Sequence, residues 1–117
     1  MRTAQEIFNI VVAHLRQQNS KSMTSYDETL CAFRGTDGRK CAIGALIPDE
    51  CYDPYMEGIH FTEFDAINEK MTNLRDEFIA HESLLQDLLI IHDRYDLDKW
   101  EDSLANIAKK FYLQFPV

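Results

Sequence analysis

The chain has 117 residues, of which 45% are apolar and 27% are charged. A chain of this length buries roughly two-thirds of its unfolded surface, so it forms a core without disulfide or metal cross-links. Four Gly and three Pro exclude collagen-like and linker-rich chains, and the apolar content exceeds that of disordered chains. These figures predict a single globular domain over residues 1–117.

The net charge of −8 is unevenly distributed along the chain. Residues 1–47 carry six Lys and Arg against four Asp and Glu, whereas residues 48–102 carry four against sixteen. An acidic field of this kind repels phosphates, which argues against binding of nucleic acid, and it attracts a protein partner with a basic surface. The non-functional interpretation of the same charges is that acidic helix faces keep the protein in solution.

The sequence predicts neither a secretory leader nor a membrane span. Polar residues interrupt every apolar run in the first ten positions, so a leader peptide is not expected. The most apolar later stretch, residues 84–91, is far shorter than the ~20 residues that a spanning helix needs. We therefore expect a cytoplasmic protein, in which the three Cys are free thiols or core residues rather than a disulfide framework.

The first predicted element is a helix over residues 4–18. Thr3 and Glu6 have the spacing of a capping box at its start. Apolar residues then recur at helical spacing up to Leu15. Residues 20–28 carry no such pattern and are expected to form a loop.

Residues 30–43 predict a β-hairpin. Two short stretches, 30–34 and 39–43, flank a Gly-Thr-Asp-Gly turn whose Asp-Gly pair suits a tight reversal. Alternation places Cys31 with Phe33 on one face of the first strand. The stretch that follows, residues 48–52, begins with a proline and two acids and predicts a short helical turn.

Two helical patterns follow the acidic stretch. Residues 62–65 predict the cap of a helix that carries apolar residues at helical spacing up to Phe78. A break is expected near residues 81–83, because Ser83 and Gln86 resemble a fresh capping box. The helix after the break is apolar on most sides, so it is expected to be the central one.

A last helical pattern begins near Asp98, which is expected to cap it, and runs from Trp100 towards Pro116. The patterns together predict an α+β fold that is mainly α, with about four long helices and one small β-hairpin.

The turn of the predicted hairpin gathers cationic side chains. Arg34, Arg39 and Lys40 flank it, and cations together with loop N–H groups can hold a phosphate or a partner's carboxylates. Tyr52 and Tyr55 follow close in the sequence and could supply the walls of a site for a nucleotide-like ligand. The same charges also guard an ordinary edge hairpin against aggregation, so both interpretations stay open.

Signals for catalysis or metal binding are weak, and no cofactor is expected. The three Cys and His60 lack the short Cys-to-Cys spacing of zinc sites, so packing in the core is the better interpretation of Cys41. A cysteine nucleophile with a histidine base stays an alternative, because such partners need not be adjacent in sequence. Two carboxylate–histidine pairs are also spaced by one helical turn, Glu77 with His81 and His92 with Asp96.

The stretch from Cys31 to Tyr52, CAFRGTDGRKCAIGALIPDECY, together with Met56 to Gly58, resembles a block found in small uncharacterised proteins of bacteriophages and bacteria. The block covers about a quarter of the chain. The resemblance implies a phage or prophage origin and attaches no activity and no residue role. Small acidic phage proteins frequently act by binding: they occlude a host enzyme, imitate the charge of nucleic acid or sequester a signalling molecule.

Three functions remain open. The first is a non-enzymatic acidic binding protein, such as a phage-encoded inhibitor of a host or defence protein. The second is a protein that binds a nucleotide or phosphate through the basic hairpin, with a homo-oligomer completing the site. The third is a small metal- or cysteine-dependent enzyme. The residues expected to contact a partner in the first case are Asp49, Glu50, Asp53, Glu57 and Glu63.

Overall fold

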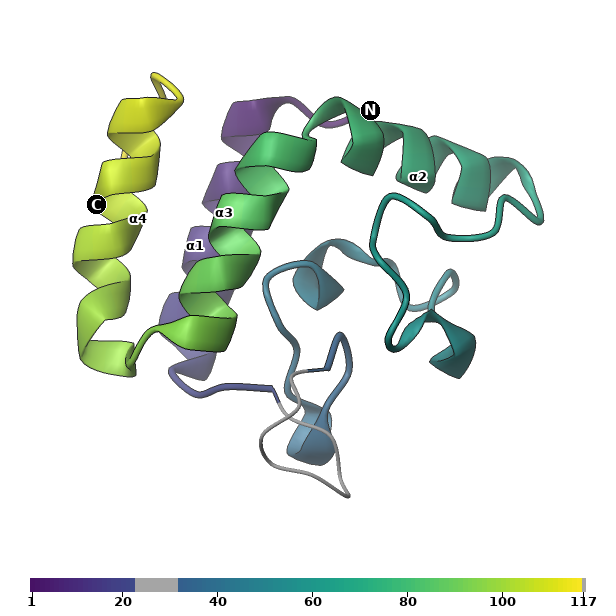
Figure 1. Cartoon of the computed structure of the whole chain (residues 1–117), viewed down its shortest axis with the longest axis horizontal. Helices are drawn as coiled ribbons and strands as arrows, with labels where there is room; N and C mark the ends of the chain where they lie inside the picture. The colour runs from purple at the N-terminus through teal and green to yellow at the C-terminus, as the bar shows by residue number, and fades with distance from the viewer. Residues whose placement is uncertain (23–31, 117) are drawn as a thin grey trace.

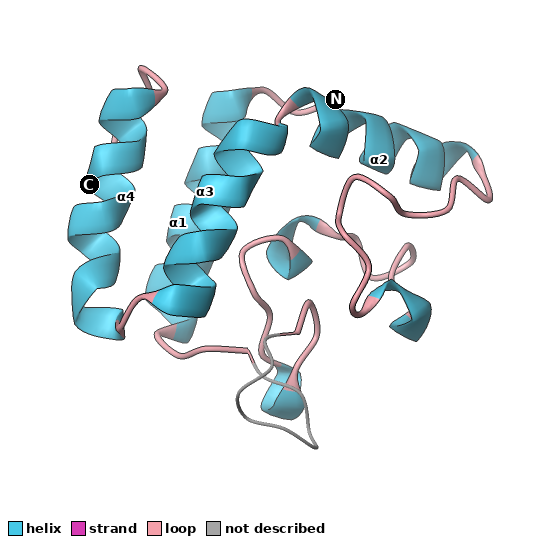
Figure 2. Cartoon of the chain, viewed as in Figure 1, coloured by secondary structure: helices cyan, strands magenta, loops and turns pink. Residues whose placement is uncertain are grey.

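The computed structural model describes residues 1–22 and 32–116. Within them the chain forms four α-helices joined by short 3₁₀ turns and irregular segments (Figures 1 and 2). The helices are α1 (Ala4–Gln18), α2 (Glu69–Ala80), α3 (Glu82–Arg94) and α4 (Trp100–Lys110). None of these helices is long and apolar enough to cross a membrane.

The arrangement of the helices is built around α3. It packs against α1, α2 and α4 (Figure 1), which confirms the prediction of a central helix. Leu84, Leu85 and Leu88 of α3 are buried. Burial on most sides explains why this segment is the most apolar of the chain.

The predicted β-hairpin is wrong. Among the described residues there is no strand, and residues 34–40 form only one isolated bridge, between Arg34 and Lys40, around a 3₁₀ turn at Thr36–Gly38. Asp37 and Gly38 do adopt positive φ, +57° and +72°, so the reversal itself is present. The fold is therefore mainly α without a sheet.

The hairpin does not extend because side chains take the backbone groups that a ladder would need. The carboxylate of Glu57 accepts the N–H groups of Phe33 and Arg34, at 2.9 and 3.1 Å. On the other arm, the Gln18 side chain accepts the N–H of Lys40 at 2.7 Å and donates to its carbonyl at 2.8 Å. The first two residues of the expected hairpin, including Cys31, lie outside the described residues.

The first helix is confirmed with its bounds and its cap. The N–H of Glu6 donates to Oγ1 of Thr3 and the N–H of Thr3 donates to the Glu6 carboxylate, both at 3.1 Å. At the other end, Asn19 adopts the left-handed conformation and its N–H donates to the carbonyl of Leu15.

The predicted start of the second helix is wrong. α2 begins at Glu69, where Oδ1 of Asn68 accepts the N–H of Met71 at 2.9 Å. Residues 61–67 precede it as irregular chain, although Phe61 and Phe64 are fully buried. Phe64 packs edge-on against Phe33 and Phe78, so its burial comes from tertiary contacts and not from a helical face.

The predicted break between α2 and α3 is confirmed, but its chemistry differs. His81 ends one helix and precedes the next, and the expected capping box of Ser83 and Gln86 is not formed. α4 likewise starts without a side-chain cap, since a 3₁₀ turn at Leu97–Lys99 leads directly into Trp100. Residues 48–52 form the predicted short helical turn, in which the N–H groups of Cys51 and Tyr52 donate to the carbonyl of Pro48 at 2.9 and 3.2 Å.

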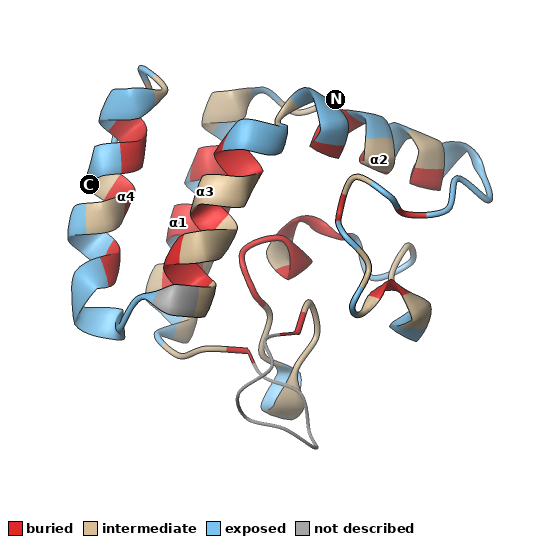
Figure 3. Ribbon diagram, in the orientation of Figure 1, coloured by how far each residue is buried: buried red, intermediate tan, exposed pale blue. Residues whose placement is uncertain are grey.

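The core extends from the contact between α3 and α4 through α1 and α2 to the irregular segment 32–68 (Figure 3). The 3₁₀ turn Gly44–Leu46 packs on α1, and Gly44 is so close to the carbonyl of Phe33 that any Cβ at this position would collide with it. Glycine is therefore required here by close backbone approach. The largest fully buried side chains are Phe8, Phe61, Phe64, Phe78, Ile7, Leu15, Ile43, Leu46, Met56, Leu85, Leu88 and Leu104.

A buried ion pair fastens the N-terminus to α2. The guanidinium of Arg2 donates to both oxygens of Glu77, at 2.8 and 2.9 Å, and to the carbonyl of Leu46 at 2.9 Å. The backbone N–H of Arg2 also donates to Glu77, at 2.7 Å. Burial raises the pKa of Glu77, but the hydrogen bonds and charge of Arg2 outweigh burial, so the net pKa is lowered.

Glu77→Gln is expected to lower the free energy of unfolding at neutral pH by about 1–3 kcal/mol, because it removes a charge-assisted bidentate pair from a buried site. Since the folded-state pKa of Glu77 lies below the unfolded value, this stabilisation is complete above the unfolded pKa and is lost as the pH falls through roughly 4 and below. Thermal melts of both proteins between about pH 3 and pH 7 measure the difference. A Tm difference that does not shrink on acidification would contradict this role of Glu77, and Glu82→Gln, at an exposed position, is the control.

Candidate functional site

Arg34 is held by its own chain. Its guanidinium donates to the carbonyl of Ile47 at 2.8 Å, pairs with Asp49 at 2.9 Å and lies over the ring of Tyr52, 4.8 Å from the centroid. These contacts engage both terminal nitrogens and the flat face of the guanidinium, with which an arginine would otherwise bind a phosphate, and leave only the buried Nε without a partner among the described residues. Two predicted ligand-binding residues, Arg34 and Tyr52, are thus brought together, but they bind each other.

Glu57 is the centre of this cluster. One of its oxygens accepts from Phe33 N–H, and the other accepts from Arg34 N–H and from the Tyr52 hydroxyl, at 2.7 Å. Burial, the hydrogen bond to Glu57 and the charge of that carboxylate raise the pKa of Tyr52 to about 12, so the phenol stays a donor. We call this set of contacts the Glu57 clamp, made of Phe33, Arg34, Tyr52 and Glu57.

Of the other three predicted ligand residues, Lys40 lies beside Arg34: the two form the isolated bridge, and their cationic groups lie 3.8 and 2.9 Å from the same oxygen of Asp49. Arg39 and Tyr55 form no hydrogen bond with the clamp among the described residues.

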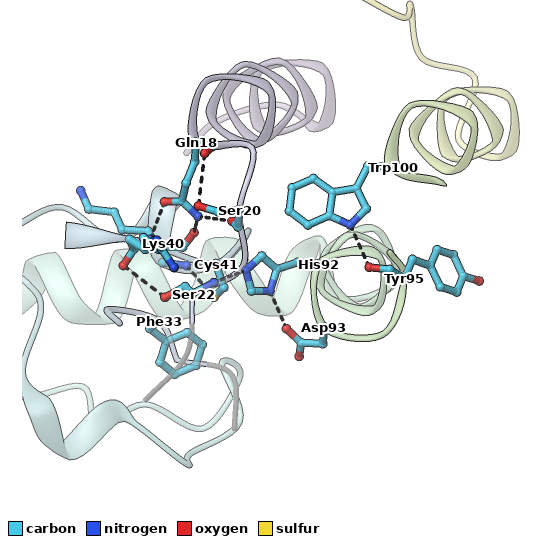
Figure 4. A network of polar contacts seen from close by, with 12 residues as sticks. Gln18, Ser20, Ser22, Phe33, Lys40, Cys41, His92, Asp93, Tyr95 and Trp100 are labelled. Carbon is cyan, nitrogen blue, oxygen red and sulfur yellow. Dashed lines mark hydrogen bonds and ion pairs between the residues drawn. The ribbon is translucent and has the colours of Figure 1, made fainter. Parts of the chain in front are cut away.

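Arg39 and Lys40 line a polar cavity of about 560 Å³ beside the end of α1. The carbonyl of Lys40 lies 2.8 Å from Nε2 of His14 and accepts from the Gln18 amide at 2.8 Å, the latter contact being visible in Figure 4. Tyr55 lies elsewhere, and its hydroxyl accepts the N–H of Asp65 at 3.2 Å.

The five predicted partner-binding acids divide into two groups. Asp49 pairs with Arg34, Glu50 lies 3.8 Å from the ammonium of Lys70, and Glu57 belongs to the clamp. Asp53 and Glu63 are exposed and form no ion pair with any residue that the structure describes.

Residues 49–69, which we call the acidic loop, contain seven Asp and Glu and no Lys or Arg. Asp65 and Glu69 are exposed as well and extend the charge of Asp53 and Glu63. Ile67 stands among them with 73% of its surface exposed. The loop therefore combines outward carboxylates with one exposed apolar side chain, a combination that the sequence analysis did not single out, although the absence of cations over 21 residues was visible there.

Neither of the two carboxylate–histidine pairs that the helical spacing allowed is formed. Glu77 binds Arg2, and His81 Nε2 lies 3.1 Å from the carbonyl of Arg2 instead. His92 is fully buried, and its Nδ1 lies 2.7 Å from Asp93, not Asp96 (Figure 4).

The ring of His92 forms hydrogen bonds through both of its nitrogens. Its Nε2 accepts the backbone N–H of Ser22 at 2.9 Å, which fixes the neutral tautomer with the proton on Nδ1, where it is donated to Asp93. The ring also packs beside Trp100, whose indole donates to the carbonyl of Tyr95 at 3.1 Å (Figure 4). Both ring nitrogens of His92 are thus engaged within the chain, and the ring joins α3 to residue 22.

Cys41 and His60 line a common cavity of about 330 Å³ together with Glu57 and Asp93. Burial raises the pKa of the Cys41 thiol to about 12, and the charges of Asp93 and Glu57 add to this rise. A nucleophilic cysteine needs the opposite shift. Although four residues of metal-ligating types line this cavity, within residues 1–22 and 32–116 no three His, Cys, Asp or Glu side chains lie so that together they could hold a metal ion.

Comparisons with known proteins give no family. No protein-family model matches the chain, and no curated protein or solved structure matches it either. The resemblance of residues 31–58 to phage and bacterial proteins therefore stays a prediction.

Alkylation distinguishes a packing cysteine from a reactive one. At about pH 8 we expect iodoacetamide to label Cys51, which is partly exposed, and to leave Cys41 unlabelled until the protein unfolds, because Cys41 is buried and protonated. Peptide mass spectrometry after native and denatured labelling measures both sites. Equal rates of alkylation at Cys41 and Cys51 in the native protein would contradict this account and would favour the hypothesis of a cysteine-dependent enzyme.

Proposed function

We propose that this chain is a non-enzymatic binding protein that contacts a basic protein surface through its acidic loop, residues 49–69. The observation that carries the proposal is the set of four exposed carboxylates, Asp53, Glu63, Asp65 and Glu69, on a loop without a single cation. Complementary charge steers association and selects against partners of the same sign.

The acidic loop is held in place before any partner binds. Oδ1 of Asp53 accepts the N–H of Tyr55 at 3.0 Å, and the Tyr55 hydroxyl accepts from Asp65. Phe61 and Phe64 anchor the loop in the core. A loop that is already ordered loses less conformational entropy on binding than a free one does, which favours affinity.

Ile67 adds an exposed apolar side chain to the loop. An exposed isoleucine among carboxylates fits a partner surface that has a small apolar hollow with Lys or Arg around it. Binding energy in such interfaces comes chiefly from the apolar anchor, and the charges at the rim mainly increase the association rate.

The alternatives have weaker support. A nucleotide or phosphate site at the turn would need Arg34, whose guanidinium is engaged by Ile47, Asp49 and Tyr52. An enzyme built on Cys41 would need a thiolate that burial disfavours. An inhibitor that occludes a basic surface of a host or defence protein is the form of binding that the resemblance to phage proteins favours.

The test is capture from bacterial lysate on the immobilised protein, at about 50 and about 500 mM salt, with quantitative mass spectrometry. We expect basic proteins to be captured at low salt and mostly released at high salt. The variant Asp53→Asn, Glu63→Gln, Asp65→Asn, Glu69→Gln is expected to lose them, because it removes the outward charge of the loop.

The matched control is Asp76→Asn, Glu82→Gln, Asp96→Asn, Asp98→Asn, which changes the net charge by the same amount at exposed positions outside the loop. It is expected to capture the same proteins as the wild type. If both variants lose them equally, capture depends on net charge alone and the proposed surface is wrong.

A further inference from the structure

The turn after α4 holds a tyrosine in a conformation that normally belongs to glycine. Tyr112 has φ +56°, and the N–H of Leu113 donates to the carbonyl of Ala108 at 2.8 Å, which closes the helix end. Glycine is the usual residue at this place, because a side chain in the left-handed region is strained. Tyr112 is also 96% exposed, so no contact within the chain compensates for the strain.

The strained turn is fixed on both sides. Behind it, Gln114 and Gln5 form a reciprocal pair: the N–H of Gln114 donates to Gln5 at 2.8 Å, and the Gln5 amide donates to the Gln114 carbonyl at 2.9 Å. Phe115 then packs beside Phe8, with ring centroids 6.3 Å apart. The tail is therefore fastened to α1, and Tyr112, in the turn at the end of α4, is exposed to solvent. An aromatic side chain that is exposed on a strained backbone indicates a site of contact with another molecule.

The outer face of α4 has a charge pattern that complements itself. Asp102, Asn106 and Lys109 are exposed and lie four and three residues apart, so they form one stripe along the helix. Rotation by two-fold symmetry about a point near Asn106 would place Asp102 of one copy against Lys109 of another. Such an isologous contact also sets the two helix dipoles antiparallel.

A groove beside this stripe can receive the tyrosine. It lies between α3 and α4 and measures about 290 Å³. Ile90, Ile91 and Ile107 line it together with Tyr95, Ser103 and Asn106, and so do Asp87 and Lys110, which form an ion pair at 2.7 Å. The turn with Tyr112 follows one end of α4, and Tyr95 precedes the other end. In an antiparallel pair, Tyr112 of each copy therefore comes to the Tyr95 end of the groove of the other.

We propose that the chain forms a two-fold symmetric dimer in which the α4 helices pack antiparallel and Tyr112 of each copy fills the α3–α4 groove of its partner. The paired helix face and the two tyrosines make an interface at the small end of the usual range, so the dimer is expected to be weak. This surface is distinct from the acidic loop, which remains available for a partner.

Sedimentation equilibrium from about 1 to about 500 μM tests the dimer. We expect the mass to rise with concentration from 13.7 kDa towards twice that value. Tyr112→Gly is expected to weaken the dimer about tenfold or more, while its Tm, measured at low concentration, equals or exceeds that of the wild type, because glycine relieves the strain. Ile79→Ser, at another exposed apolar position, is the control and should leave the dimer unchanged.

Charge reversal on α4 tests the same dimer interface independently. Asp102→Lys and Lys109→Asp are each expected to weaken the dimer, and the double variant to restore it, because the swapped charges again face each other across the axis. A mass of 13.7 kDa at every concentration would overturn the proposal. A dimer that survives Tyr112→Gly, or charge variants that do not rescue each other, would overturn the assigned interface.

Discussion

The Glu57 clamp is the interaction on which the arrangement of the irregular half depends. One carboxylate accepts the N–H groups of Phe33 and Arg34 and the hydroxyl of Tyr52, and so joins the basic turn to the acidic loop. The guanidinium of Arg34 adds a second link, to Ile47 and Asp49. Charge-assisted hydrogen bonds of this kind are about twice as strong as neutral ones, and here they replace the strand ladder that the turn would otherwise form.

The contacts beside the clamp also bear on which charges face solvent. The guanidinium of Arg34 pairs with Asp49, and the ammonium of Lys40 lies 3.8 Å from the same Asp49 oxygen, whereas Arg39 forms no ion pair with any described residue. Asp53, Glu63, Asp65 and Glu69 remain exposed. These exposed carboxylates are the basis of the proposed binding function.

Local signals predicted well where local chemistry decides the structure. The capping box of Thr3 and Glu6 located α1 correctly, and the apolar pattern correctly indicated that α3 is central. The hairpin prediction was wrong because the N–H groups of Phe33 and Arg34 donate to Glu57, which is 24 and 23 residues away in sequence. The predicted ligand site was wrong for the same reason. Arg34 and Tyr52 do lie together, but they bind Asp49 and Glu57, two acids that the sequence predicted to form a separate partner-binding surface.

Amide hydrogen exchange in the wild type and in Glu57→Ala tests the role of the clamp most directly, with Glu63→Ala, at an exposed carboxylate, as the control. The account predicts that Glu57→Ala lowers the protection of the Phe33 and Arg34 amides by about tenfold or more and also loosens the acidic loop, while the amides of α1 and α3 keep theirs. Unchanged protection at Phe33 and Arg34 would contradict the claim that Glu57 holds the turn against the acidic loop.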